Sequence, residues 1–427
     1  MHILVVGGGW SGCAAAIAAR KQGAGATLLE RTDMLLGTGL VGGIMRNNGR
    51  FTATEEMIAL GGGDLFGLTD ANSLHRNIQF PGHDHASLYN VATMEPIVRA
   101  YLESLGIAVR TNTRIDGVRM DGATMLAVSA KPTDSSGVPA LFQADAFVDA
   151  TGTAGPMNLC AKHGNGCAMC ILRCPSFGGR ISLTGLAGIL ETIGRKGDLI
   201  GAMSGSCKLL KESLAPEILA RLNKDGVAIV PIPKGIHGEA DISGKACQQY
   251  ALKEFKDNLI LLDTGHAKLM TPYFPLDSLR SIPGFANARY EDPYAGGQGN
   301  SMRYMAMAPR DNALKVAGLA NLFCGGEKAG LLVGHTEAIV TGTLAGHNAA
   351  RWASGREPLT LPPELAVGDS IAHVGERMRT EEGLGLKYTF SGSVYFDRMR
   401  ELGLYSVDTE AIRKRVARSG LGGVFSA

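Results

Sequence analysis

A chain of 427 residues is long enough for two or three domains, and its 45% hydrophobic content can fill sizeable cores. Its 42 basic and 40 acidic residues leave a formal net charge of +2, which neither demands nor excludes an anionic partner such as nucleic acid. The opening apolar run passes straight into glycines, and no uncharged run of about 18 apolar residues follows. We therefore expect a cytoplasmic protein without a signal peptide or membrane span.

The first predicted unit is the stretch ILVVGGGWSGCAAAIAAR. Its four aliphatic residues, 3–6, predict a buried parallel strand, and the alanine-rich run that follows predicts a helix packed tightly on a sheet. Between them Gly7, Gly9 and Gly12 form a GxGxxG motif. We expect Gly7 to permit a tight turn, Gly9 to let a diphosphate approach the helix N-terminus, and Gly12 to allow close helix packing.

A second strand is predicted over residues 26–30, and it ends in Glu30. This carboxylate lies eighteen residues beyond Gly12, where it can accept hydrogen bonds from an adenosine ribose. We also predict Arg31, the next residue, as a cofactor-binding residue. A strand before the glycines, a helix after them and an acid at this spacing together predict dinucleotide binding.

The middle of the N-terminal region adds no chemistry of its own. Residues 88–122 predict a helix, a strand, a turn and a strand. The stretch HRNIQFPGHDH carries His75, His83 and His85. Since nothing else with metal-ligand spacing accompanies them, we expect exposed loop histidines.

Two later segments indicate which dinucleotide is bound. ALFQADAFVDATGTAG is an apolar strand ending in Asp-Ala-Thr-Gly, and LANLFCGGEKAGLLVGHTEAIVTGTLAGHNAAR is a strand, a Gly-Gly-acid turn and a long helix. With the first unit, they resemble the FAD-binding fingerprints of the two-dinucleotide-binding-domain flavoproteins. The last segment looks most like the GidA/TrmFO group of flavoproteins, which are involved in tRNA modification.

The resemblance implies roles for particular residues. Gly7, Gly9 and Gly12 would hold the FAD pyrophosphate, and Glu30 would hold the ribose. The residues that would lie under the cofactor or meet its ribityl chain are Ala150, Thr151, Gly152, Gly326 and Glu327.

The start of the long late helix is a further candidate site. If the helix begins near Gly334 to Glu337, its N-terminal amides would face the edge of the flavin where reduction leaves negative charge. His335 lies at this start, where a proton donor or a hydrogen bond to the cofactor would be useful. We therefore predict Gly334 as a cofactor-binding residue and His335 as a catalytic residue.

Four segments are predicted along the chain. They are a first part of the FAD-binding domain over 1–155, an inserted substrate or partner domain over 156–300, a second part of the FAD-binding domain over 301–355, and a mainly helical segment over 356–427. The insertion predicts helices around 183–222, then strands over VAIVPIPKG and NLILLDTGHAKLMT. No second GxGxxG occurs there, so we expect no separate NAD(P)H-binding domain, and NAD(P)H as a donor would have to dock transiently over the flavin.

A run of four cysteines opens the insertion. Cys160, Cys167, Cys170 and Cys174 have the spacing Cx6Cx2Cx3C, close to the predicted flavin end of the sheet. Three interpretations remain: an iron-sulfur or zinc site on all four, redox thiols facing the flavin, or buried inert cysteines. The gap of six is unusual for a cluster, so the redox pair Cys167 and Cys170 is favoured as catalytic.

The sequence therefore predicts an α/β protein, in which a Rossmann-like FAD-binding domain is interrupted by an inserted α+β domain. The predicted function is an FAD-dependent oxidoreductase with a small-molecule or protein redox partner, acting as a homo-oligomer. Two alternatives remain: folate-dependent tRNA methyl transfer, which the near-neutral charge does not support, and an FAD/iron-sulfur electron-transfer subunit. The tail predicts a basic helix in EAIRKRVARSG, normally a solvated face.

Overall fold

The structure is a computed structural model. It describes residues 1–133, 138–152, 177–196, 199–200, 202–203, 206–236, 250, 252–271, 274–291, 302–303 and 305–426. Within these residues, no helix combines the length and the apolar character that a membrane crossing requires.

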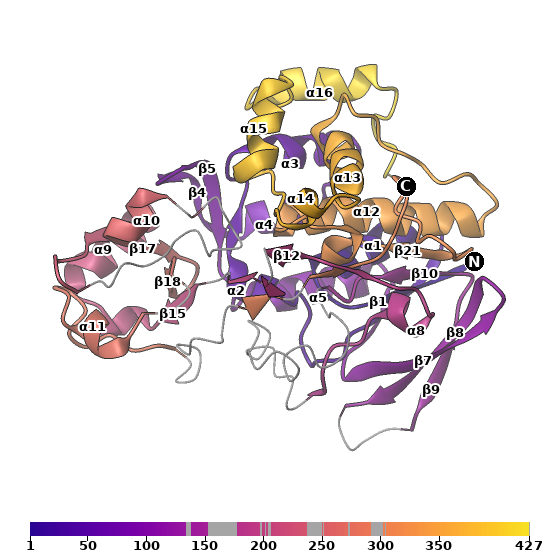
Figure 1. The fold of residues 1–427 in the computed structure, drawn as a ribbon, viewed down its shortest axis with the longest axis horizontal. Coiled ribbons are helices and arrows are strands. Elements are labelled where there is room, and N and C mark those ends of the chain that lie inside the picture. Colours follow the sequence, from indigo (N-terminus) through magenta and orange to yellow (C-terminus); the bar gives the residue numbers. More distant parts are fainter. Residues whose placement is uncertain are drawn as a thin grey trace.

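A five-stranded parallel sheet lies at the centre of the molecule (Figure 1). Its strands, in spatial order, are β21 (Leu322–Cys324), β10 (Ala146–Asp149), β1 (His2–Val6), β2 (Gly25–Leu29) and β6 (Ala108–Arg110). Ile3, Leu4 and Val5 of β1 are fully buried, as an apolar strand covered on both faces should be. The α/β class and the predicted strand, glycine turn and helix at the N-terminus are confirmed.

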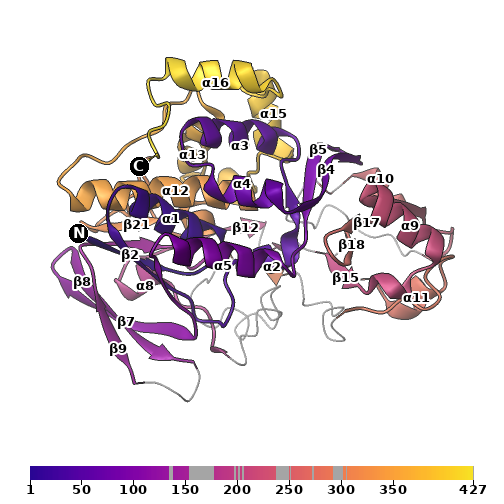
Figure 2. The ribbon, with the colours of Figure 1, turned by 180° about the vertical axis from the view of Figure 1, so that it is seen from behind.

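Two helices pack on each other beside this sheet. They are α1 (Trp10–Lys21) and α12 (His335–Ala353); α5 (Met94–Ser104) lies on the other side of α1 (Figure 2). A Cβ atom on Gly342 would lie 2.1 Å from the carbonyl oxygen of Ser11, and one on Gly346 would lie 2.0 Å from that of Ala15. The glycines of α12 therefore let the two helices approach to backbone contact.

Two smaller antiparallel sheets flank the central one. The sheet β7–β8–β9 consists of β7 (Thr113–Asp121), β8 (Thr124–Pro132) and β9 (Ala140–Gln143). The sheet β3–β5–β4 consists of β3 (Ile44–Met45), β5 (His83–Tyr89) and β4 (Ser73–Phe80). The helices close to it in the sequence are α2 (Gly39–Gly42), α3 (Gly49–Ala59) and α4 (Asp64–Ala71).

The expected exposed histidine loop is instead the hairpin of β4 and β5. His83 is 2% exposed and stacks on Phe80 with ring centroids 4.6 Å apart, while Asn47 Nδ2 lies 2.9 Å from its Nδ1. His75 Nε2 lies 2.9 Å from Asp263 Oδ2. The expectation of exposure is wrong for His83, because a partner sheet that the local sequence does not reveal covers this hairpin.

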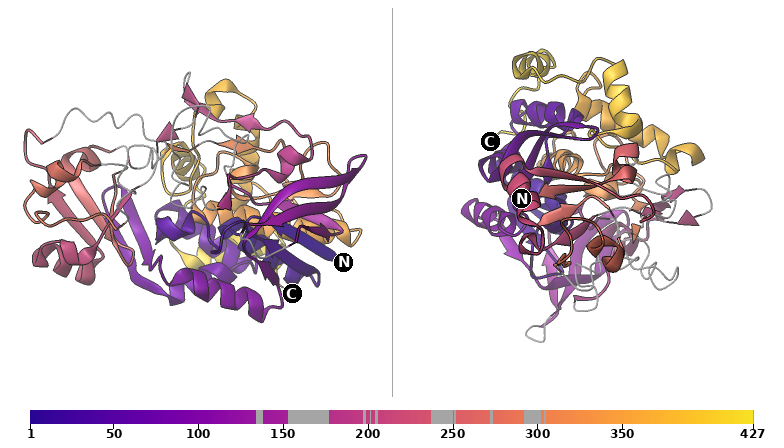
Figure 3. Two further views of the ribbon diagram at one scale, coloured as in Figure 1. Left: turned by 90° about the horizontal axis from the view of Figure 1, so that it is seen from below. Right: turned by 90° about the vertical axis from the view of Figure 1, so that its left-hand side faces the viewer.

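A four-stranded antiparallel sheet, here called the outer sheet, stands at one end of the molecule (Figure 3, left). Its elements are β15 (Cys207–Leu209), β18 (Ala267–Leu269), β17 (Asn258–Asp263), β16 (Val227–Pro231), α9 (Pro216–Asp225), α10 (Lys253–Asp257), α11 (Leu276–Arg280) and the 3-10 turn η2 (Lys211–Ser213). It has a hydrophobic core of its own, which includes Leu209, Leu261 and Leu269. The predicted strands of the insertion are confirmed.

The helices expected around 183–222 are confirmed only in part. Here the chain forms the short helix α8 (Leu183–Leu186), two-residue strand pairs and then α9. The pairs are β11 (Thr192–Ile193) with β20 (Ala306–Met307), β12 (Arg195–Lys196) with β13 (Leu199–Ile200), and β14 (Ala202–Met203) with β19 (Met302–Arg303). For β11 and β14, strand partners distant in sequence override the local helical preference.

The C-terminal region is helical and covers the top of the molecule in Figure 1. Its helices are α13 (Ala366–Arg377), α14 (Glu381–Leu384), α15 (Ser393–Glu401) and α16 (Thr409–Arg418). The predicted helical tail and basic helix are confirmed as secondary structure, while the domain boundaries at 155, 300 and 355 stay a prediction.

Candidate functional site

One cavity collects most of the predicted site residues. It lies at the carboxyl ends of the central strands, where open α/β sheets place their ligands. The predicted residues that line it are Gly7, Gly9, Glu30, Arg31, Ala150, Thr151, Gly152, Gly326, Glu327, Gly334 and His335. Gly12 lies behind this lining, in the first turn of α1.

The three motif glycines meet three different constraints. Gly7 has a φ of +104°, and a Cβ there would lie 2.3 Å from the carbonyl oxygen of Ala150. A Cβ on Gly12 would lie 1.8 Å from the carbonyl oxygen of Gly7, so this glycine allows α1 to pack on the turn. A Cβ on Gly9 would meet no protein atom within 4 Å. Gly9 therefore faces the open cavity and does not pack against the rest of the protein.

The N-terminus of α1 suits a phosphate group. Gly9 is the N-cap, no side chain caps the helix, and its first turn carries no acidic residue. Its first amides therefore keep their donor capacity and the positive end of the helix dipole. Ser11 is 5% exposed and lines the cavity, yet its Oγ has no hydrogen-bond partner among the described residues. A diphosphate would satisfy both the amides and this buried hydroxyl, so the site fits the FAD pyrophosphate.

Glu30 is held rigidly at the next position around the cavity. Its Oε2 accepts from the backbone amide of Gly8 at 2.7 Å, and its Oε1 accepts from the amide and hydroxyl of Thr32 at 2.9 and 3.0 Å. A carboxylate has about four acceptor directions, so these three bonds orient Glu30 and leave capacity for about one ribose hydroxyl. Arg31 Nη1 donates to the carbonyl oxygen of Gly178 at 2.7 Å.

The opposite end of the cavity is built around the start of α12. This helix begins at His335, as predicted, with Gly334 as N-cap at a φ of +145°. A Cβ on Gly334 would lie 2.0 Å from Arg50 Nη2 and 2.0 Å from Glu337 Oε2. Only glycine therefore fits between these two charged side chains.

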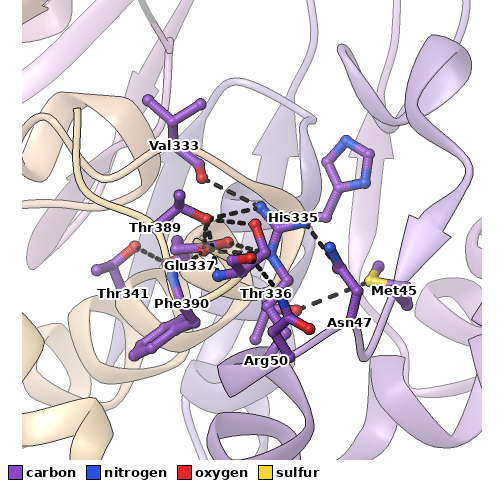
Figure 4. Close-up of polar contacts among 12 residues, drawn as sticks. Met45, Asn47, Arg50, Val333, His335, Thr336, Glu337, Thr341, Thr389 and Phe390 are labelled. Carbon is purple, nitrogen blue, oxygen red and sulfur yellow. Dashed lines mark hydrogen bonds and ion pairs between the residues drawn. The ribbon is translucent and has the colours of Figure 1, made fainter. Parts of the chain in front are cut away.

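Arg50 and Glu337 form a buried ion pair beneath this helix start (Figure 4). Arg50 Nε lies 3.2 Å from both carboxylate oxygens of Glu337, whose Oε1 also accepts from the Thr389 hydroxyl at 2.6 Å and the Phe390 amide at 2.8 Å. Arg50 Nη1 donates to Asn47 Oδ1 at 3.2 Å. The network joins α3, α12 and the segment before α15, and Arg50 also lines the cavity.

His335 points away from this network in Figure 4. Its Nδ1 lies 3.5 Å from the Tyr89 hydroxyl, and its ring centroid is 6.1 Å from that of Trp10. A Cβ on Gly42 would lie 1.7 Å from its Cε1, so the α2 turn packs directly on the imidazole. His335 therefore lies in the cavity wall beneath α2, and its catalytic role stays a prediction.

Ser11, Arg50 and Lys268 also line the cavity, and our sequence analysis missed them. The sequence did contain a signal for Ser11, since it is a polar residue in an otherwise apolar first helix turn. Arg50 and Lys268 had none, because their contacts join segments far apart in the sequence.

The cysteine run lies outside the described residues, so the roles predicted for Cys160, Cys167, Cys170 and Cys174 stay predictions. Where the chain is described, no group of three or more His, Cys, Asp or Glu side chains could hold a metal ion. Three other cysteines are buried: Cys13, Cys207 and Cys324. Burial raises the pKa of Cys207 and of Cys324 to about 12, so both are neutral thiols at neutral pH.

Two family models match separate parts of the chain. Residues 2–164 match the family described as FAD dependent oxidoreductase, and residues 263–357 match glucose inhibited division protein A. A methylenetetrahydrofolate–tRNA-(uracil-5-)-methyltransferase, TrmFO from Caldicellulosiruptor bescii, is 34% identical over 98 residues. That match covers 22% of this chain and 21% of the relative, about a fifth of its length.

Two solved structures share the fold over nearly the whole chain. GidA from Aquifex aeolicus in its form II crystal has a TM-score of 0.56 and 16% identity, and covers 98% of this chain and 76% of that one. The form I crystal of the same protein has a TM-score of 0.54 and 15% identity, with 98% and 78% covered. The likeness extends beyond the sheet to the outer elements.

Proposed function

We propose that this chain, which is similar to the GidA and TrmFO flavoproteins, acts as an FAD-dependent oxidoreductase on a small molecule. The observation that supports the proposal is the cavity, in which an uncapped helix start suited to a phosphate group lies at one end and a buried ion pair at the other. FAD, when bound, supplies a ring that takes up and returns two electrons, a chemistry that ordinary side chains lack.

Different residues of the chain would bind different parts of FAD. Gly9, Ser11 and the amides at the start of α1 would hold the pyrophosphate, and Glu30 would hold the adenosine ribose. Gly326 and Glu327, which line the same cavity, would meet the ribityl chain.

The α12 end of the cavity would carry out the chemistry. The first amides of α12 and the guanidinium of Arg50 favour negative charge there, although Glu337 offsets the Arg50 charge. His335, 3.5 Å from the Tyr89 hydroxyl, is the proposed proton donor.

Cys167 and Cys170 are the proposed redox thiols. Oxidation of the pair to a disulfide would form one S–S bond and release two protons, and its two electrons would pass to the flavin. The described residues on either side of the run support this, because Gly152 and Arg180 both line the cavity, with Arg180 Nη1 3.1 Å from a Cβ placed on Gly152.

The test is an anaerobic reductive titration of the purified protein, followed by its flavin spectrum. The wild type should bind FAD and accept more than two electrons per FAD, whereas the double variant Cys167→Ser/Cys170→Ser should accept only two. The control Cys207→Ser, which changes a buried thiol of the outer sheet, should keep the wild-type count. If the wild type accepts only two electrons per FAD, Cys167 and Cys170 are not redox-active thiols. Iron and sulfide that copurify with the protein would favour a cluster that includes Cys160 and Cys174. A purified protein that binds no FAD would refute the oxidoreductase proposal.

A second candidate, tRNA modification, rests on the match to the tRNA methyltransferase. The basic helix α16 gives it limited support, because Arg415 turns inward to Glu56 Oε1 at 2.8 Å and Lys414 pairs with Glu410 at 2.7 Å. RNA binding that weakens steeply with salt would favour this candidate. RNA binding that bulk tRNA does not compete away, or that does not change with salt concentration, would refute this candidate.

A further inference from the structure

Arg50 has one more hydrogen-bond donor than it has partners (Figure 4). A guanidinium group carries five N–H groups, one on Nε and two on each Nη. Nε donates to the Glu337 carboxylate, and Nη1 donates to Asn47 Oδ1 at 3.2 Å. Nη2 donates to the carbonyl oxygen of Val333 at 3.2 Å and to the hydroxyl of Thr389 at 3.1 Å. The second N–H of Nη1 therefore has no acceptor among the residues that the structure describes.

This donor is buried, yet it belongs to a side chain in the cavity wall. Arg50 is 5% exposed and lines the cavity, as does Gly334, on which a Cβ would lie 2.0 Å from Arg50 Nη2. A buried donor on a charged group loses its hydration without a replacement, which is unfavourable. A ligand in the cavity can supply the missing acceptor.

The guanidinium is already fixed in position without such a ligand. Its three neutral partners come from the turn before α3, the segment before α12 and the segment before α15. A donor held in this way needs no rearrangement when a ligand binds.

The charge of the Arg50 site favours a neutral acceptor. Glu337 lies 3.2 Å from Arg50 Nε, and its side chain is fully buried. The two charges balance, so an anion at Arg50 would gain little Coulomb energy and would be repelled by the nearby carboxylate. A neutral carbonyl oxygen accepts the hydrogen bond without this repulsion.

The pyrimidine ring of FAD carries two neutral carbonyl groups, at C2 and C4. We propose that Nη1 of Arg50 donates a hydrogen bond to one of these carbonyl oxygens, and that Glu337 keeps the donor site electrically balanced. Arg50 then orients the flavin ring at the α12 end of the cavity, and Glu337 acts through Arg50 as a positioning residue. This inference rests on the proposed function.

The first experiment records the ¹³C NMR signals of the FAD-loaded protein, with FAD labelled at C2 or at C4. Arg50→Lys keeps a positive charge beside Glu337 but lacks Nη1. The signal of the hydrogen-bonded carbonyl carbon should move upfield in this variant while the other stays in place, and FAD should bind roughly tenfold more weakly. The control is Arg46→Lys, since Arg46 pairs with Glu55 at 2.7 Å and Asp70 at 2.5 Å and does not line the cavity. It should change neither signal.

The second experiment measures the two-electron potential of bound FAD by equilibration with a reference dye. Glu337→Gln keeps a side-chain oxygen for Thr389 and Phe390 but removes the negative charge that balances Arg50. Since reduction leaves negative charge on the flavin ring, this variant should favour reduced over oxidised FAD roughly tenfold, which raises the potential by about 30 mV.

Each outcome decides a separate point. Unchanged C2 and C4 signals in Arg50→Lys would refute the inference even if FAD binds more weakly, because Arg50 would then only support the fold. An unchanged potential in Glu337→Gln would refute the charge balance at the flavin, and it tests the inference even if Arg50→Lys does not fold. A wild-type protein that binds no FAD would refute the proposed function instead, so the two failures are distinguishable.

Discussion

Gly9 and Gly12 lie three residues apart in one motif, but the structure predicts opposite consequences for their substitution. Gly9 has an extended conformation that other residues adopt, and a Cβ there meets no protein atom within 4 Å. Gly9→Val should therefore change the stability of the FAD-free protein by less than about 1 kcal/mol. Its branched side chain would occupy the cavity where the pyrophosphate approaches, and loss of one or two charged hydrogen bonds should weaken FAD at least about 100-fold.

Gly12→Ala is the matched comparison. Its Cβ would lie 1.8 Å from the carbonyl oxygen of Gly7, and a backbone atom cannot move aside as a flexible side chain can. Overpacking of about 1 to 3 kcal/mol exceeds the gain of about 1 kcal/mol in helix propensity, so the FAD-free protein should lose stability. Urea unfolding without FAD and FAD titration by fluorescence measure the two effects. Stoichiometric FAD of unchanged affinity in Gly9→Val would refute this account of the cavity.

Three further substitutions test other parts of the site and fold. Ser11→Ala should weaken FAD roughly tenfold but stabilise the FAD-free protein by about 1 kcal/mol, since it removes an unpaired buried hydroxyl; an unchanged FAD affinity would place Ser11 outside the site. Glu337→Ala should cost about 3 to 5 kcal/mol in urea unfolding because it leaves Arg50 buried and unpaired, and the double variant Arg50→Met/Glu337→Leu should cost less; equal costs would contradict the ion pair. Burial lowers the pKa of His347 to about 4 from 6.5, so stability should be complete above pH 6.5 and fall by roughly 3 kcal/mol as the pH drops to 4, a loss that His347→Leu should reduce.

The FAD-binding half of the fold could be predicted because its signals are local. A strand, three glycines and a helix follow one another within a short stretch, and each glycine has a structural reason that its spacing indicates. The start of α12 at His335 was predictable for the same reason, since a glycine-rich turn directly precedes it. The sequence order alone then brings these segments to one edge of a parallel sheet.

The outer part of the site could not be predicted, because its residues meet through tertiary contacts. Arg50 finds Glu337 across 287 positions, and Lys268 reaches Val41 across 227. His83 resembled an exposed loop histidine because the sheet that covers it is remote in sequence. Local pattern gives no information on such pairs, and an isolated arginine or lysine is normally a surface residue.

The two helix starts that meet at the cavity differ in how their positive ends are balanced. The first turn of α1 has no acidic residue, so its full positive end is available to a diphosphate. The first turn of α12 contains Glu337, whose charge is neutralised by Arg50, so this end contributes amide dipoles with little net charge. Because the close packing at Gly342 fixes both helices in one orientation, neither field can be adjusted by helix movement. Of the two helix starts, that of α1 is therefore the better site for a charged diphosphate.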